Sequence, residues 1–129
     1  GEEELLLIHT PGHTAGCVSL LYRPRGRGVG TPGMLFTGDH LSAFKNKKTE
    51  AEAEGGSRSS AAPHRFSSPR LTAMPRVCWH DWPTQRESVR KLIGLDFSAV
   101  LPGHGPRAYF PGGVEEKDAA LEEMLRAEP

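Results

Sequence analysis

The fold is decided by the stretch LLLIHTPGHTAG at residues 5–16. Its apolar run, residues 5–8, predicts a β-strand that is covered on both faces. Pro11-Gly12 predicts a sharp turn, because proline lacks a backbone donor and glycine tolerates unusual dihedral angles. His13 follows at the tip of that turn, before a second apolar run begins at Cys17. The stretch therefore predicts a strand that delivers a histidine into a glycine-rich loop.

Two later stretches repeat this arrangement: MLFTGD at residues 34–39 and AVLPGHG at residues 99–105. In each, a short strand-like run leads into a glycine-containing loop with a metal-capable side chain, first Asp39 and then His104. Strands fix the anchors of the loops that follow them, and small glycines let the backbone approach an ion. We expect His13, Asp39 and His104 to converge on one metal site.

Length and charge limit the classes of protein that the chain can represent. With 129 residues and 14.0 kDa it is long enough for one domain. Its 16 basic and 16 acidic residues give no net charge, which argues against a charge-driven nucleic-acid or membrane-surface protein. No apolar run approaches the roughly 20 residues that cross a bilayer, and no signal or transit peptide is visible, so we expect a soluble intracellular chain. A start at glycine is expected of a partial or processed sequence.

The remaining elements follow from local patterns. Apolar runs predict strands at residues 17–22, 34–37 and 97–101. Thr84 and Glu87 form a capping box after Pro83 and predict a helix that starts there. A second helix is predicted over residues 114–125, with acidic residues in its first turns. Only two cysteines occur, so we expect reduced thiols, with Cys17 as a small core residue.

Residues 42–76 change in character. Lysines, then glutamates alternating with alanine, then Gly/Ser-rich segments show no sustained period. Such a composition cannot bury enough apolar area to offset the entropy of ordering it. We therefore expect a disordered insertion over residues 42–76 and take His64, which lies inside it, as a solvated loop histidine.

The chemistry of the three loops suits a dinuclear hydrolytic zinc site. Such a site needs neutral imidazoles and a carboxylate that can span two cations. Zinc binds imidazole nitrogen and carboxylate oxygen at about 2.0–2.2 Å, so its ligands have to be rigidly placed. A single Pro-Gly-His turn is weak evidence, but two such turns and a Thr-Gly-Asp, each after an apolar run, are hard to obtain by accident.

With the motifs HTPGHTAG, FTGDHL and LPGHG, the chain resembles the metallo-β-lactamase fold superfamily, and within it the glyoxalase-II-like hydrolases. The resemblance covers nearly all of the chain outside residues 42–76. It implies an α/β (α+β) fold in which residues 1–129 are the C-terminal half of a four-layer αβ/βα sandwich. It also implies a narrower likeness to a plant and algal branch, carried by SVRKL at residues 88–92 and the following segments, and hence a plastid location.

The resemblance assigns roles to the three site residues. His13 matches the single histidine of one metal site, Asp39 the bridging aspartate that holds the two ions together, and His104 the last histidine, on the second metal. Two Zn²⁺ ions per intact domain are implied, with Fe or Mn as alternatives. The family's His-x-His-x-Asp-His segment is absent from this chain. Each metal would keep only one histidine and Asp39, fewer than the three protein ligands usual for catalytic zinc.

Other histidines are weaker candidates for the missing ligands. His40 directly follows Asp39 and, in an extended segment, points the opposite way. His9 precedes the turn and is expected to pack or hydrogen-bond beside it. His80, between Trp79 and Trp82, is expected at a packed edge of the helix layer rather than in a substrate-side wall.

The function implied by the resemblance is hydrolysis of a thioester or ester by metal-bound hydroxide. The expected partners are a small-molecule substrate and the missing N-terminal half of the domain, without nucleic acid or membrane. The alternatives are a truncated non-catalytic remnant or interaction module with an incomplete metal site, and an oxygen-reducing di-iron member of the same fold. A half-sandwich would expose one apolar sheet face, so we expect the chain alone to be marginally stable.

Overall fold

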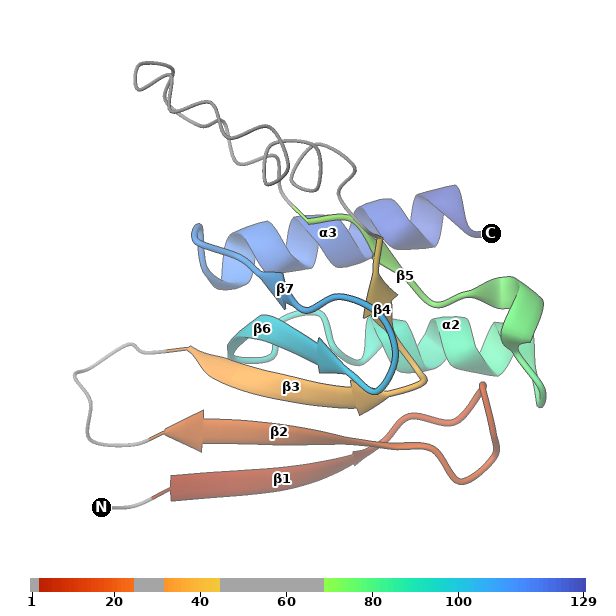
Figure 1. The fold of residues 1–129 in the computed structure, drawn as a ribbon, viewed down its shortest axis with the longest axis horizontal. Coiled ribbons are helices and arrows are strands. Elements are labelled where there is room, and N and C mark those ends of the chain that lie inside the picture. Colours follow the sequence, from red (N-terminus) through yellow and green to blue (C-terminus); the bar gives the residue numbers. More distant parts are fainter. Residues whose placement is uncertain (1–2, 25–31, 45–68) are drawn as a thin grey trace, which may run out of the picture.

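The computed structural model describes residues 3–24, 32–44 and 69–129, and its centre is one mixed β-sheet (Figure 1). The sheet has five strands in the order β1-β2-β3-β6-β7. Strands β3 and β6 are parallel, and the other neighbours are antiparallel. The bounds are Glu3–His9 for β1, Val18–Pro24 for β2, Gly33–Gly38 for β3, Phe97–Pro102 for β6 and Ala108–Tyr109 for β7. The α/β fold class predicted from the sequence is confirmed.

Two helices lie together on one side of this sheet (Figure 1). They are α2, Trp82–Arg90, and α3, Val114–Ala127. A short antiparallel pair, β4 at Ser42–Ala43 and β5 at Leu71–Thr72, lies beside them, and a 3₁₀ turn, η1 at Pro75–Val77, precedes α2. Within the described ranges, neither helix is both long enough and apolar enough to span a membrane.

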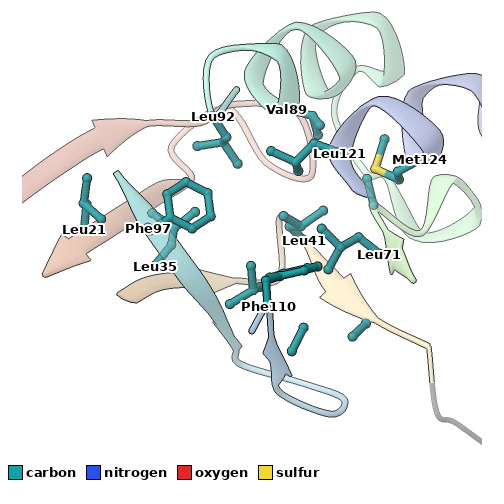
Figure 2. Close-up of a cluster of buried hydrophobic side chains, with 14 residues drawn as sticks. Leu21, Leu35, Leu41, Leu71, Val89, Leu92, Phe97, Phe110, Leu121 and Met124 are labelled. Atoms are coloured by element: carbon teal, nitrogen blue, oxygen red, sulfur yellow. The ribbon is translucent and has the colours of Figure 1, made fainter. Parts of the chain in front are cut away.

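The hydrophobic core lies between the sheet and the helices (Figure 2). Leu21 and Leu35 reach it from the sheet, and Val89 and Leu121 reach it from α2 and α3. All four are at most 1 % exposed. At roughly 1.5–3 kcal/mol for each fully buried aliphatic or aromatic side chain, this cluster is the main stabilising contribution in the described chain.

Strand β1 corrects one expectation. The run at residues 5–8 was predicted to be covered on both faces, but among the described strands β1 lies at the edge and pairs only with β2. Leu5 and Leu7 are 63 % and 77 % exposed. A continuous apolar run indicates apolar neighbours on both faces, and the described chain supplies helices on only one.

The exposed side of the sheet is apolar over several strands. Register places Leu7 opposite Leu20, and Leu20 opposite Phe36, so these residues share one face. The exposed apolar residues of this face are Leu5, Leu7, Val18, Met34, Phe36 and Tyr109. An exposed apolar sheet face was expected from the sequence, and the structure has one.

The start of α2 also differs from the prediction. The cap is Asp81 rather than Thr84, because the Asp81 carboxylate accepts a hydrogen bond from the Thr84 backbone N–H at 2.9 Å. Pro83 lies in the first turn, where a missing N–H costs nothing, instead of stopping the chain before the helix. The helical pattern was predicted correctly, and its N-cap was placed three positions late.

The ends of the expected insertion are ordered parts of the core. Strands β4 and β5 pair with each other, and Leu71 and Ala73 are 4 % and 1 % exposed. The expected boundaries of 42–76 were therefore wrong at both ends. The expectation for residues 45–68, with His64, lies outside the described residues.

The cysteines are free thiols, as expected. Cys17 is only half-buried, lies just before β2, and its sulfur contacts the Thr14 hydroxyl at 3.0 Å. The prediction that it is a core residue was wrong, since the apolar core begins further along β2.

Candidate metal centre

The three residues singled out by the sequence lie at one edge of the sheet. Asp39 follows β3 and His104 follows β6, and these strands are parallel neighbours. Strand β1 runs in the same direction as β3, because each is antiparallel to β2, so the loop with His13 reaches the same edge. The Gly103 N–H donates to the Gly38 carbonyl at 2.7 Å and holds the two later loops together.

Asp39 is the centre of this group, with one carboxylate oxygen toward each histidine. His104 Nδ1 lies 2.5 Å from Asp39 Oδ1, and His13 Nε2 lies 3.9 Å from Asp39 Oδ2. The side chains differ in exposure: 13 % for His13, 38 % for Asp39 and 81 % for His104. The structure thus brings all three together, with His13 on the buried side and His104 open to solvent.

The loop that carries His13 is held against the segment before α2. The Gly12 carbonyl accepts from the Asp81 N–H at 3.0 Å and from the Cys78 thiol at 3.1 Å. The His13 carbonyl accepts from the Trp79 N–H at 3.1 Å. His13 is therefore fixed by backbone contacts with a region more than 60 residues away, which the sequence motif does not reveal.

The loop that carries His104 is fixed from the other side. The Ser42 hydroxyl donates to the His104 carbonyl at 2.7 Å, so the short strand β4 supports the second histidine. The hydrogen bond to Asp39 and the charge of that carboxylate raise the pKa of His104 above its ordinary value of 6.5. An exposed imidazole beside a carboxylate is thus biased toward its charged form when no metal competes for it.

His40 points into the protein and does not join the group. It is fully buried, and burial, with smaller contributions from His13 and Lys91, lowers its pKa to about 4. It is therefore a neutral imidazole at physiological pH. The expectation that it points away from the Asp39 side agrees with this burial.

Of the remaining expectations, the one for His9 is confirmed and the one for Trp79 and His80 is wrong. His9 Nε2 lies 3.0 Å from the Ala15 carbonyl, so His9 hydrogen-bonds beside the turn as expected. Trp79 is 77 % exposed and His80 is also exposed, so the packed edge predicted for them was wrong. Trp82 alone is partly packed, and its indole N–H donates to the Pro129 carbonyl at 2.9 Å.

The donor types suit a metal such as zinc, but the number of donors does not complete a site. Two imidazoles and one carboxylate are common zinc ligands, and catalytic zinc takes three protein ligands per ion. Among residues 3–24, 32–44 and 69–129, no three His, Cys, Asp or Glu side chains are grouped so that they could hold a metal ion. The described residues place one imidazole near each oxygen of the Asp39 carboxylate, His104 at Oδ1 and His13 at Oδ2.

Two supporting residues on α2, Gln85 and Ser88, were not predicted from the sequence. Gln85 is fully buried on α2, and its amide donates to the His40 and Ala73 carbonyls at 3.0 and 2.7 Å. Ser88 is also buried and donates to the Pro11 carbonyl at 2.7 Å. Both lie on the helix face that meets the His13 loop. A polar residue at a core-facing helical position was the available hint.

No protein-family model matches the chain, and no solved structure matches it. The chain is 32 % identical over 103 residues to the protein named "Probable metallo-hydrolase YflN" of Bacillus subtilis (strain 168). The matched part is 80 % of this chain and 32 % of that relative, so the chain spans less than half of the relative's length. This similarity suggests a family of metallo-hydrolases, and it gives no support to the narrower plant and algal branch or to a plastid location.

Proposed function

We propose that the chain is part of a metal-dependent hydrolase in which His13, Asp39 and His104 contribute metal ligands. The observation that carries this proposal is their convergence from three separate loops at one sheet edge, with Asp39 between the two imidazoles. The printed name of the relative supports the same class of reaction. Zinc is the metal we expect from the donor types, with Fe or Mn as alternatives.

Each residue has a distinct part in this proposal. Asp39 offers one oxygen to each side and is the residue placed to bridge two ions. A bound metal would supply an activated water for hydrolysis. The remaining ligands would come from a segment outside this chain, and the expected His-x-His-x-Asp-His segment would provide them. The substrate class we propose, a small-molecule thioester or ester, rests on the resemblance of the sequence motifs.

The ligand count is tested by metal analysis of the chain itself. After equilibration with zinc and dialysis, we expect less than one tightly held ion per chain, and less still in Asp39→Ala. Glu122→Gln on α3 is a matched control, because this exposed residue lies away from the three loops. Two tightly held ions per chain would contradict the count of ligands given above.

The reaction is tested on a longer protein that contains this chain and the missing ligands. Asp39→Ala should lower thioester hydrolysis by more than the roughly 10–100-fold that is typical for residues outside the metal's own ligands. The Glu122→Gln variant should keep the activity. Equal rates for Asp39→Ala and the unmodified protein would refute the proposed role of Asp39.

A non-catalytic interaction module is the second candidate. It is favoured by the shortage of grouped metal donors among the described residues and by the exposed apolar sheet face. This candidate predicts neither metal binding nor hydrolysis in the longer protein. Both candidates expect little metal in the chain alone, so metal analysis and hydrolysis of the longer protein separate them.

A further inference from the structure

Four buried polar atoms without a hydrogen-bond partner among the described residues belong to three neighbouring residues at the His13 loop. They are Nδ1 of His13, both ring nitrogens of His40 and Oε1 of Gln85. The three residues are neighbours: the Gln85 amide donates to the His40 carbonyl at 3.0 Å, and the loop at Gly12 presses against Gln85. Buried polar atoms are almost always paired in folded proteins, so four on three neighbouring residues call for a common explanation.

The hydrogen-bonding capacity of these atoms can be assigned. The Gln85 amide nitrogen faces two carbonyls, those of His40 and Ala73, so the unpaired atom is the oxygen, which only accepts. His40 is fully buried, and no carboxylate among the described residues hydrogen-bonds its ring, so it is neutral, with one N–H donor and one acceptor nitrogen. His13 Nε2 faces Asp39 at 3.9 Å, while Nδ1 faces the interior.

Among these atoms, the number of hydrogen-bond donors equals the number of acceptors for only one tautomer of His13. With a proton on Nδ1, His13 adds a second donor, so two donors face two acceptors. His13 Nδ1–H can then donate to one nitrogen of His40, and the N–H of His40 can donate to Gln85 Oε1. With the proton on Nε2 instead, three acceptors would face a single donor, and two buried acceptors would stay unpaired.

We propose that His40 and Gln85 are positioning residues that hold His13 as its Nδ1–H tautomer and leave Nε2 free toward Asp39. The two bonds form directly, through small rotations of the side chains. Histidines that bind metals usually donate their other ring N–H to a neighbouring group, which fixes the orientation and tautomer of the ring. This inference rests on the proposed function in one respect, namely that Nε2 is the atom offered to a metal.

The tautomer of His13 can be read directly by nitrogen-15 NMR of the metal-free chain at pH 8. The unmodified chain should show a protonated Nδ1 and an unprotonated Nε2. In His40→Leu, which removes both ring nitrogens, His13 should become a mixture of tautomers. His40→Gln keeps a donor and an acceptor and should restore the Nδ1–H form. Gln85→Met should weaken the preference, since it removes the terminal acceptor.

Ser88→Ala is the matched control. Ser88 is also buried on α2 and also contacts the His13 loop, through the Pro11 carbonyl, but it has no unpaired atom facing the histidine rings. Its removal should leave the tautomer unchanged. Urea unfolding of every variant shows whether it is folded, and if His40→Leu does not fold, Gln85→Met and His40→Gln carry the test.

Zinc affinity provides the second readout and separates this inference from the proposed function. Titration of the chain with zinc against a chromophoric chelator should show affinity lowered about 10–100-fold in His40→Leu and restored in His40→Gln. If the unmodified chain binds no zinc, as its shortage of ligands allows, the tautomer alone decides the inference. The proposed function fails separately, if Asp39→Ala leaves hydrolysis by the longer protein unchanged. A protonated Nε2 in the unmodified chain, or an unchanged His13 tautomer in both His40→Leu and Gln85→Met, would overturn it.

Discussion

Gly12 sets how closely the His13 loop can approach helix α2. Its φ of +146° lies in a region that side-chain-bearing residues rarely adopt. A Cβ at this position would lie 2.1 Å from the Cβ of Gln85, so even a methyl group has no room. The glycine therefore allows the contact between the loop and the polar atoms behind His13.

Gly12→Ala should destabilise the chain and displace His13. The strained dihedral and the overlap with Gln85 should together cost about 2–4 kcal/mol. Urea unfolding measures this loss, and NMR of the His13 ring reports its displacement. Gly16→Ala is the control, because a Cβ there meets nothing within 4 Å and its φ is not positive. Similar losses in the two variants would show that the approach to Gln85 is unimportant.

At the scale of residues, the sequence predicts the candidate site residues better than it predicts the residues that support them. His13, Asp39 and His104 could be selected because proline, glycine and apolar runs mark strand ends, and the structure brings these three together. Their role as metal ligands stays a prediction. Gln85 could not be selected, because its importance depends on a loop more than 70 positions earlier in the chain.

The junction between α2 and α3 depends on a buried lysine. Lys117 is fully buried on α3, and its ammonium donates to the carbonyls of Leu92 and Leu95 at 3.1 and 2.8 Å. It also lies 2.6 Å from the Asp118 carboxylate and 4.1 Å from the centre of the Phe97 ring. One side chain thus ties α3 to the turns that connect α2 with β6.

The pKa of Lys117 is lowered below its ordinary value of 10.5, because burial disfavours the charge more than Asp118 and Asp96 favour it. The folded state therefore releases this proton at lower pH than the unfolded state. Stability should rise as the pH increases through the folded-state pKa toward 10.5, and the increase should be absent in Lys117→Met.

Lys117→Met should therefore destabilise the chain more at pH 10 than at pH 7. At pH 10 the variant loses the hydrogen bonds to two carbonyls, at a cost of about 1–3 kcal/mol. At pH 7 part of that loss is offset, because a buried charge is removed as well. Urea unfolding of both proteins at pH 7, 9 and 10 measures the difference between their free energies of unfolding. Other groups that titrate in this range affect both proteins alike, so they cancel in this difference. A difference that stays constant or shrinks with pH would contradict this account.

At the scale of elements, long periodic segments were predicted well and their ends poorly. Helix α3 and strands β3 and β6 follow from apolar spacing and from neighbouring glycines and prolines. The cap of α2 was missed because Asp81 and Thr84 are both good capping residues, and only the fold selects between them. Strands β4 and β5 are two residues long, too short for any period to show.

The two faces of the central sheet have opposite environments although both are apolar. Leu35 on β3 is fully buried beneath the helices, whereas its neighbours Met34 and Phe36 are 38 % and 42 % exposed. On β1, Leu7 is 77 % exposed. Residues that alternate along a strand face opposite sides, so a run that is apolar throughout has to leave one side uncovered when helices cover only the other. The sequence predicted such runs, but it could not show which face the helices would take.

A contiguous apolar face of this kind favours self-association of the chain in water. The double variant Leu7→Thr/Phe36→Thr should therefore lower concentration-dependent association and the binding of an apolar dye, with a stability change of less than about 1 kcal/mol for β-branched threonine in exposed strand positions. Leu35→Thr changes the opposite face of the same strand and should cost about 2–5 kcal/mol, since it opens a cavity and buries a hydroxyl. Sedimentation velocity over a range of concentrations measures the association, and urea unfolding measures the stability. If the double variant associates as strongly as the unmodified chain, self-association arises elsewhere, and the exposed face is covered or inert in solution.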